Sequence, residues 1–453
     1  MVRSLAQELP ARGWSVTVLS GSRRDIEGAG DARTFYRGLD PHVVDFTDAL
    51  AAPDPMQPGP GSPPMHPSYE DREGAPDRVF ASLNDADYER QVQAWTHALE
   101  AAGGDAVDVL HLHHLTPLNE AAVRAAPGVP VVGHLHGTEL IMLERIAEGP
   151  PPAWDHAERW AERMRGWAAD CAQLVVASAG GADRAARVLG IERGRFGVVP
   201  SGLDPAAWRR RPVDRPAHWR RHLVERPRGW RPGHDAGSVR YREADLTAFE
   251  DGPVLLYVGR FTAVKRLPLL IEAYARAQER FERRAPLVLI GGHAGEWEGE
   301  HPFDTIARTG ASDVFLAGWH DREELAEFFS AADAIVLPSA AEQFGQVLIE
   351  GMACELPALA VRALGAAEIV DSGRTGWLVE PEDEGGLADA LVEIVNHGDE
   401  RRRRGRRARD AVCARFTAGA AADQLIQVLV AASRAPRGIT RRAPRAAPAP
   451  TTG

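Results

Sequence analysis

Short apolar runs alternate with longer stretches in which apolar residues recur every three or four positions, and this alternation occurs in two blocks of the chain. The short runs predict buried strands, and the longer stretches predict amphipathic helices. Helices that alternate with strands are typical of a parallel sheet covered on both faces. The pattern therefore predicts an α/β fold with two doubly wound parallel-sheet domains that face each other across a cleft.

The first block covers residues 1–200. Its predicted strands lie at 15–20, 107–112, 129–135, 173–177 and 196–199. Its predicted helices lie at 5–11, 88–102 and 119–126; two more follow, one after the strand 129–135 that ends at 169 and one after the strand 173–177 that ends at 189. A long segment over residues 22–84 interrupts this block and carries a proline-rich stretch. Because structureless loops of this length are uncommon in compact domains, we expect a disordered or passive surface loop there rather than a functional flap.

The second block covers residues 252–416. Its predicted strands lie at 254–258, 287–290, 314–316, 334–337, 358–361 and 377–379. Residues 201–251 predict a hinge followed by a linker or insertion rich in arginine and proline. A last helix is predicted over residues 417–433, and the Pro/Ala/Arg-rich composition of 434–453 predicts a disordered tail.

The chain of 453 residues has 53 basic and 64 acidic side chains, a formal net charge of −11. This balance argues against a dedicated nucleic-acid-binding protein. Arginine clusters at 209–231 and 401–407 predict solvated faces, with weak docking to anionic lipid or an acidic partner as a second interpretation. Three widely spaced cysteines, no signal peptide and no apolar run of about 18 residues predict a cytoplasmic protein, soluble or at most peripheral on a membrane.

Lys265 is the only lysine, so the other basic residues are all arginine. Its surroundings match neither a P-loop nor the strand lysine of a kinase. A pyridoxal Schiff base could form only at this position.

Arg260 and Lys265 follow a predicted buried strand and precede the first helix of the second block. Ligands bind at the carboxyl ends of parallel strands, beside the free N–H groups of a helix N-terminus. The planar guanidinium of Arg260 and the compact ammonium of Lys265 would bind phosphate oxygens in different ways. Because arginine fills every other basic position, the pair predicts a diphosphate site more strongly than a capping arginine and a solvated lysine.

A second motif contains two carboxylates. Glu342 follows the strand predicted over 334–337. Glu350 lies just over one turn into the helix that comes after that strand. Between them, Phe344, Gly345 and Gln346 would present backbone N–H groups at the start of that helix. Carboxylates accept hydrogen bonds from sugar hydroxyls, although an acidic first helical turn is a simpler explanation for such a pair.

These motifs together resemble the retaining nucleotide-sugar glycosyltransferases of family four. The similar segments are GRxxxxK at 259–265, ExFGxxxxE at 342–350, GMACELP at 351–357 and GAAEIVDSGRTGWLVEPED at 365–383. HLHGTEL at 134–140 is similar to the family's histidine segment, and VVPSGLD at 198–204 to its hinge. The resemblance implies the GT-B fold, in which two Rossmann-like domains face a cleft, the first contacting the acceptor and the second the donor.

The resemblance also implies roles in donor binding. Arg260 and Lys265 would hold the donor diphosphate and stabilise it as leaving group, and Glu350 would bind the nucleotide ribose. Fixed cations can stabilise the charge that develops on the diphosphate without a metal. No metal and no cofactor is therefore expected.

The roles near the transferred sugar follow in the same way. Glu342 and the backbone of Phe344, Gly345 and Gln346 would hold the sugar hydroxyls, and His136 would approach the reaction centre from the amino-terminal domain. Together with the two cations, Glu342 and His136 are the expected catalytic residues.

Several histidines near His136 raise the alternative of a zinc site. His111, His113, His114 and His134 occur in the same region. Alternation along a strand separates neighbouring side chains onto opposite faces, and no cysteine or carboxylate completes a tetrahedral set in the sequence. This reasoning argues against a metal.

Two departures from the family pattern occur. Glu355 stands where the family's helix usually continues with a glycine, which would alter a helix end. The chain also begins inside the helix that normally follows the family's first strand and glycine-rich loop, so we expect an incomplete amino-terminal domain.

Asp85 and Asp87 form a DxD that precedes a helix and is better explained as an N-cap than as a metal site.

The function expected from the resemblance is transfer of a hexose from a nucleotide diphosphate sugar, with uridine diphosphate (UDP) as the commonest carrier in the family. The acceptor would be a sugar, a glycolipid or a small-molecule aglycone. The alternatives are an inactive nucleotide-sugar-binding remnant or scaffold and, less favoured, a GT-B-fold epimerase or phosphorylase.

Overall fold

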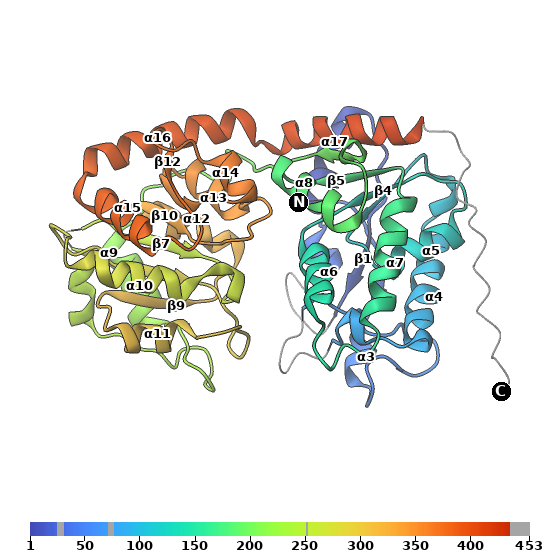
Figure 1. The fold of residues 1–453 in the computed structure, drawn as a ribbon, viewed down its shortest axis with the longest axis horizontal. Helices are drawn as coiled ribbons and strands as arrows, with labels where there is room; N and C mark the ends of the chain where they lie inside the picture. Colours follow the sequence, from blue (N-terminus) through green and yellow to red (C-terminus); the bar gives the residue numbers. More distant parts are fainter. Residues whose placement is uncertain (25–30, 71–76, 251, 435–453) are drawn as a thin grey trace.

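The computed structural model describes residues 1–24, 31–70, 77–250 and 252–434, which form two lobes side by side (Figure 1). The carboxy-terminal lobe contains a six-stranded parallel sheet in the order β12-β11-β10-β7-β8-β9. Its strands are β7 Leu255–Val258, β8 Leu287–Ile290, β9 Val314–Gly318, β10 Ala334–Leu337, β11 Ala358–Val361 and β12 Gly376–Val379. The four strands at the centre, β7, β8, β10 and β11, are buried along their whole length, as expected for strands covered by helices on both faces.

The amino-terminal lobe contains a four-stranded sheet in the order β3-β4-β5-β6, whose strand pairs are also parallel. The strands are β3 Leu110–His113, β4 Val131–His134, β5 Gln173–Val176 and β6 Phe196–Val198. The helices of this lobe include α4 Asp85–Ala101, α5 Pro117–Ala125, α6 Thr138–Glu148, α7 Ala157–Asp170 and α8 Ala179–Leu189. The predicted α/β class and parallel sheets are confirmed.

The last described helix, α17 Ala418–Ser433, returns from the carboxy-terminal lobe to the amino-terminal one (Figure 1). Leu425 and Leu429 of α17 join a hydrophobic cluster with Val132 of β4 and Val175 of β5. Leu5 of helix α1 Val2–Glu8 belongs to the same cluster. The two ends of the described chain therefore pack together on the same sheet.

The expectation of a disordered or passive surface loop over residues 22–84 is wrong for the part of it that the structure describes. Strand β1 Leu19–Ser22 pairs in parallel with β2 His42–Asp45 in a separate two-stranded sheet, and helices α2 Ala32–Phe35 and α3 Thr47–Ala51 flank β2. Met56 and Phe80 are almost fully buried and share a core with Trp95 of α4. Apolar side chains inside the proline-rich stretch thus hold it against the lobe.

Strand β1 begins four residues later than the strand predicted over 15–20. Gly21 within it lies so close to Phe46 that a Cβ there would stand 2.5 Å from the ring. Such close packing, rather than strand propensity, accounts for a strand at a Ser- and Gly-rich sequence.

Residues 205–250 are packed against the carboxy-terminal lobe. Trp208, Trp219 and Trp230 are buried in the core of its sheet. The Trp230 indole N–H donates to the carbonyl of Gly292 at 2.9 Å. This segment, with helix α9 Arg215–Arg220, is therefore part of the lobe and not an exposed linker.

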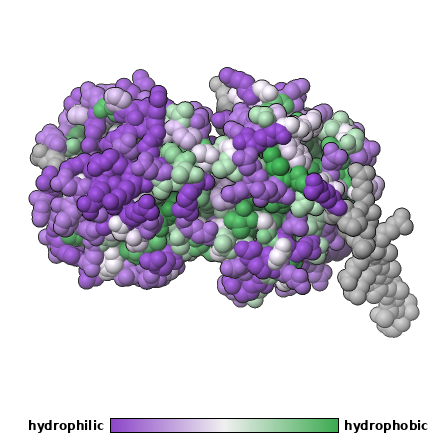
Figure 2. Space-filling model, turned by 90° about the horizontal axis from the view of Figure 1, so that it is seen from above, coloured by the Kyte–Doolittle hydropathy of each residue, from purple (hydrophilic) through white to green (hydrophobic). Residues whose placement is uncertain are grey.

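The arginine cluster at 401–407 lies on helix α16 Gly398–Arg415, over the lobe whose surface is strongly hydrophilic when seen from above (Figure 2). Arg401 and Arg404 are nevertheless buried, and Arg404 lies over the Trp377 ring at 4.0 Å. Arg402, Arg403, Arg406 and Arg407 are the exposed members, and Arg402 and Arg403 pair with acidic residues of the first helical turn. The cluster is therefore partly structural and only partly a solvated face.

The other helices of the carboxy-terminal lobe are α10 Leu267–Gln278, α11 Pro302–Thr309, α12 Arg322–Ala331, α13 Gln346–Ala353, α14 Leu364–Ile369 and α15 Glu384–Asn396. Among the described residues, no helix combines the length and apolar character needed to cross a bilayer. The predicted disordered tail lies outside the described residues apart from Arg434.

Candidate functional site

The two motifs of the second block meet at the carboxyl ends of β7 and β10, which are adjacent strands of the sheet. The Ser339 hydroxyl and the Ala340 N–H both donate to the carbonyl of Val264, each at 3.2 Å. The loop after β7 is further held by Tyr257, whose hydroxyl donates to the Arg260 carbonyl at 2.8 Å. Strand order and these hydrogen bonds together bring the cation-bearing loop beside the carboxylate-bearing loop.

Lys265 and Glu342 form a direct ion pair between these loops. Both side chains are more than four-fifths buried, at 18% and 17% relative exposure. Lys265 lies in a short 3-10 turn, Ala263–Lys265, immediately before α10. The ammonium thus occupies the junction between the two sequence motifs.

Arg260 forms an ion pair with Glu70, a residue of the amino-terminal lobe. Burial lowers the pKa of Arg260, but Glu70 and nearby carboxylates more than offset that effect and raise the pKa above its usual value. The guanidinium, 48% exposed, remains cationic and accessible. Nothing in the sequence of the segment around Glu70 indicated this contact, because it depends on how the two lobes meet.

Phe344, Gly345 and Gln346 form the turn into α13. Gly345 has φ of 99°, a left-handed conformation that favours glycine. Phe344 is buried and contacts Phe416 edge-on, with ring centroids 5.5 Å apart. The turn is therefore held in place by packing. The first N–H groups of α13 have no acceptor within the helix, as at any helix N-terminus.

Glu350 is buried on α13, where its Oε1 accepts from Arg322 at 2.6 Å and from the Gln346 amide at 3.1 Å. Burial raises the pKa of Glu350, and the Arg322 contact opposes this rise. The carboxylate lies on the helix that follows β10, the strand beside β7, and its role toward a ribose stays a prediction.

His136 lies just after β4 in the other lobe. Its ring Nε2 is 2.8 Å from Nδ1 of His113, and burial lowers its pKa to about 4. The next residue, Gly137, has φ of 98°, and a Cβ there would stand 2.1 Å from Cγ of Gln343. His136 is thus held at the contact between the amino-terminal lobe and the loop that contains Glu342.

Gln343 was missed by sequence reasoning, although it lies inside the second motif. The Ser178 hydroxyl donates to its carbonyl at 2.9 Å, across the two lobes. Close by, the Gly180 N–H donates to Glu368 at 3.0 Å. These contacts fix the Glu342 loop against the first turn of α8.

The strand-face argument against a histidine cluster is wrong. His111 and His113 are separated by one residue and share a face of β3, and His134 on β4 pairs directly with His113. A carboxylate also lies close by, since Glu139 is 2.6 Å from His114. The nitrogen atoms of His111, His113 and His134 approach within 4.8 Å of one another.

Two smaller expectations concern helix ends. The N-cap of α4 is Asn84, while Asp85 and Asp87 lie in its first turn, so neither aspartate is the cap itself. Glu355 has φ of 64° just beyond α13, the left-handed conformation in which glycine is most favourable. The position therefore retains a glycine-like backbone without a glycine.

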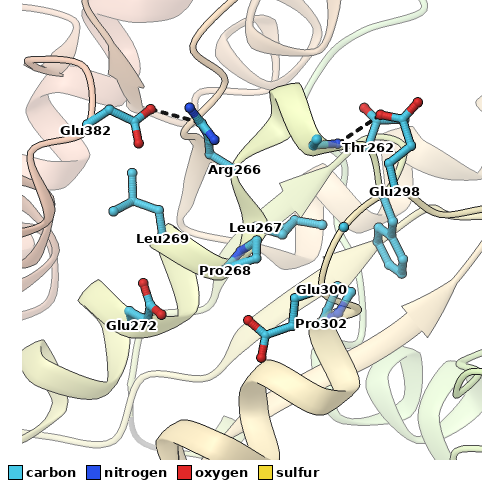
Figure 3. A pocket seen from close by; sticks show the side chains of 13 residues that line it. Thr262, Arg266, Leu267, Pro268, Leu269, Glu272, Glu298, Glu300, Pro302 and Glu382 are labelled. Atoms are coloured by element: carbon cyan, nitrogen blue, oxygen red, sulfur yellow. Dashed lines mark hydrogen bonds and ion pairs between the residues drawn. The ribbon is translucent and has the colours of Figure 1, made fainter. Parts of the chain in front are cut away.

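A hollow of about 310 Å³ lies on the outer side of the start of α10 (Figure 3). Figure 3 shows Glu272, Glu298 and Glu300 around it, with Arg266 turned toward Glu382 at 2.8 Å. An acidic lining repels phosphate oxygens. Apart from Arg266, the charged residues that line this hollow are acidic, so the hollow does not suit a diphosphate.

Glu70 should compete with an anionic ligand for Arg260. Replacing it (Glu70→Gln) is expected to lower the dissociation constant for inorganic diphosphate by about 2- to 5-fold, since partly exposed ion pairs contribute up to about 1 kcal/mol. Calorimetric titration at low and high salt measures this change. Glu100→Gln, which removes an exposed carboxylate on α4, is the control, and unchanged or weaker binding in Glu70→Gln would contradict the competition.

Two family profiles match the chain. The one described as "Glycosyltransferase Family 4" matches residues 1–207, and "Glycosyl transferases group 1" matches residues 242–411. D-inositol 3-phosphate glycosyltransferase 2 of Catenulispora acidiphila is 31% identical over 64% of this chain, which spans 62% of that relative's length, less than two thirds. The D-inositol 3-phosphate glycosyltransferase of Streptomyces avermitilis is 30% identical over 79% of this chain and 73% of its own length.

Solved structures agree on the architecture. Anabaena HepE in complex with UDP and glucose superposes with a TM-score of 0.62 over 95% of this chain and 94% of its own, at 17% identity. Sucrose-phosphate synthase of Thermosynechococcus elongatus superposes with a TM-score of 0.60 over 91% of this chain and 98% of its own, at 20% identity. The sequence matches and the paired parallel sheets show that this chain belongs to glycosyltransferase family 4 and has the GT-B fold.

Proposed function

We propose that this protein transfers a hexose from a UDP-linked sugar to an acceptor, with retention of the anomeric configuration. The observation that supports it best is the arrangement of Arg260 and Lys265 at the carboxyl end of β7, beside the Glu342 loop and the start of α13. Family membership supports the sugar-transfer chemistry and retention. HepE, a relative in fold, was solved with UDP and glucose, which supports the choice of UDP.

The mechanism follows from charge. Breaking the bond between the sugar and the diphosphate builds negative charge on the leaving phosphate. Arg260 and Lys265 are cations at fixed positions and stabilise that charge as it forms, so they lower the barrier without moving. Without a donor, Arg260 pairs with Glu70 and Lys265 pairs with Glu342. The diphosphate of the donor replaces Glu70 as the partner of Arg260.

The remaining donor contacts are assigned by position. Glu350 binds the ribose hydroxyls through its carboxylate. Glu342 and the backbone from Phe344 to Gln346 bind the sugar. His136 reaches the same place from the amino-terminal lobe, and the low pKa keeps its ring neutral, so it can exchange a hydrogen bond with a sugar hydroxyl.

The base has a suitable surface nearby. Trp319 follows β9 and is 42% exposed, and its ring stacks on His293 with centroids 4.0 Å apart. An exposed aromatic face at the same end of the sheet offers stacking to a planar base. We assign the base to this side of the site.

Donor binding is the first test. UDP at about 100 times its dissociation constant should stabilise the folded protein by about 2.7 kcal/mol, seen as a rise in Tm. ADP and GDP serve as comparisons for the base. If no nucleoside diphosphate raises Tm, the donor site is wrong.

Turnover is the second test. UDP-sugars are incubated with the protein alone and with sugar, glycolipid and small aglycone acceptors, and UDP release is measured. Acceptor-dependent release with the α-configured product from an α-linked donor supports the proposal. Donor binding without release across all acceptors would instead favour a nucleotide-sugar-binding protein.

A further inference from the structure

A group of imidazoles lies at the carboxyl ends of β3 and β4. His111 and His113 project from one face of β3, and His134 projects from the paired position on β4. His111 Nε2 is 3.1 Å from His134 Nδ1, and one nitrogen from each of the three rings lies within 4.8 Å of the others. Parallel pairing of two histidine-bearing strands brings these nitrogens together.

We propose that His111, His113 and His134 bind a divalent transition metal of the zinc class. Zinc bonded to imidazole at about 2.0–2.1 Å in a tetrahedron requires its ligand nitrogens to be about 3.4 Å apart. The pair formed by His111 and His134 is already near that separation. The nitrogen of His113 lies within 4.8 Å of the other two and has to come closer by rotation of its side chain.

One of the rings has an unsatisfied group. His134 is fully buried, and its Nε2 has no hydrogen-bond partner among the described residues. A buried polar nitrogen without a partner is destabilising. Packing among the described residues therefore does not meet the hydrogen-bonding needs of this ring.

The donor set selects the class of metal. Three imidazoles and no carboxylate at the centre suit zinc, copper, nickel and cobalt, whereas magnesium and calcium prefer oxygen ligands. Three protein ligands leave a fourth position open.

The neighbours form an outer layer around this group. His113 contacts His136 at 2.8 Å through Nδ1, which leaves its Nε2 for the metal. The Glu139 carboxylate accepts hydrogen bonds from the backbone of His136 and Gly137, and lies 2.6 Å from His114. Partners that orient a ligand imidazole in this way are characteristic of metal sites. The metal would therefore also fix the orientation of His136.

The test uses the full chain, purified without a polyhistidine tag and stripped of metal with a chelator. Titration with Co²⁺ should give the visible absorption of a tetrahedral or five-coordinate complex at about one equivalent per chain, and Zn²⁺ should remove that absorption. Calorimetry with Zn²⁺ gives the affinity, and Mg²⁺ should give no heat of binding.

Two variants locate the site. His111→Gln removes one of the two partly buried ligands, and His134→Gln removes the fully buried one. Each should weaken Zn²⁺ binding by at least about 10- to 100-fold. His97→Gln, which replaces an exposed histidine of α4, should bind as the unaltered chain does. If the unaltered chain binds no Co²⁺ or Zn²⁺, or if His111→Gln binds as tightly as His97→Gln, the cluster is only a stack of packed imidazoles and the proposal is wrong.

Discussion

Replacing Lys265 with alanine should lower kcat/KM for the sugar donor by about 10²-fold or more, the size of effect seen when one fixed charge contact to a developing anion is lost. The ammonium lies at the junction of the β7 and β10 loops and is largely shielded from solvent. Water cannot easily replace it there. Initial rates of UDP release over a range of donor concentrations measure the change.

Two further variants separate charge from folding. Lys265→Arg keeps the charge and should recover part of the activity, although its planar group fits the position differently. Arg276→Ala removes an exposed cation from α10 and should leave kcat/KM and Tm nearly unchanged. Full turnover by Lys265→Ala would rule out Lys265 as the diphosphate contact.

Gly365→Ala should have an effect of similar size through the backbone. A Cβ at this position would stand 2.3 Å from the Phe344 Cα and 2.7 Å from the Gln343 carbonyl oxygen. The Gly365 N–H also donates to the Glu342 carbonyl at 3.2 Å. The Glu342 loop must therefore move, and displacement of a substrate-positioning group by about 1 Å can cost about 10²-fold in rate.

The stability change provides an independent measurement for this variant. Overpacking should cost about 1–3 kcal/mol in the free energy of unfolding, measured by urea denaturation. Gly385→Ala is the matched control, because a Cβ there meets only the Asp383 carboxylate at 3.6 Å and lies within α15. Equal donor kinetics in the two variants would show that the loop tolerates the added methyl group.

The second half of the chain could be predicted well because its signals are local. The run Leu255–Val258 is wholly apolar and becomes a fully buried strand, and the residues that follow such strands are placed at the ligand-binding edge by the fold itself. The sequence pattern therefore predicted the sheet. The chemistry expected of Arg260 and Lys265 at that edge stays a prediction.

Features that depend on distant contacts could not be predicted. Glu70 and Arg260 are 190 positions apart, and no local pattern indicates their ion pair. The strand Leu19–Ser22 contains two serines and a glycine, so its conformation depends on its neighbour and on Phe46 rather than on propensity. The histidine group differs, because its pattern is local. His111 and His113 are two positions apart, so strand alternation places them on the same face.

Helix α17 links the order of synthesis to the order of folding. Its side chains cover one face of the amino-terminal sheet, yet its residues leave the ribosome only after the whole carboxy-terminal lobe. Until then, Val132 and Val175 lack this cover, and the early lobe carries an apolar face that chaperones can recognise. The core of the amino-terminal lobe can therefore be completed only after the carboxy-terminal lobe has been synthesised, although each lobe has its own sheet.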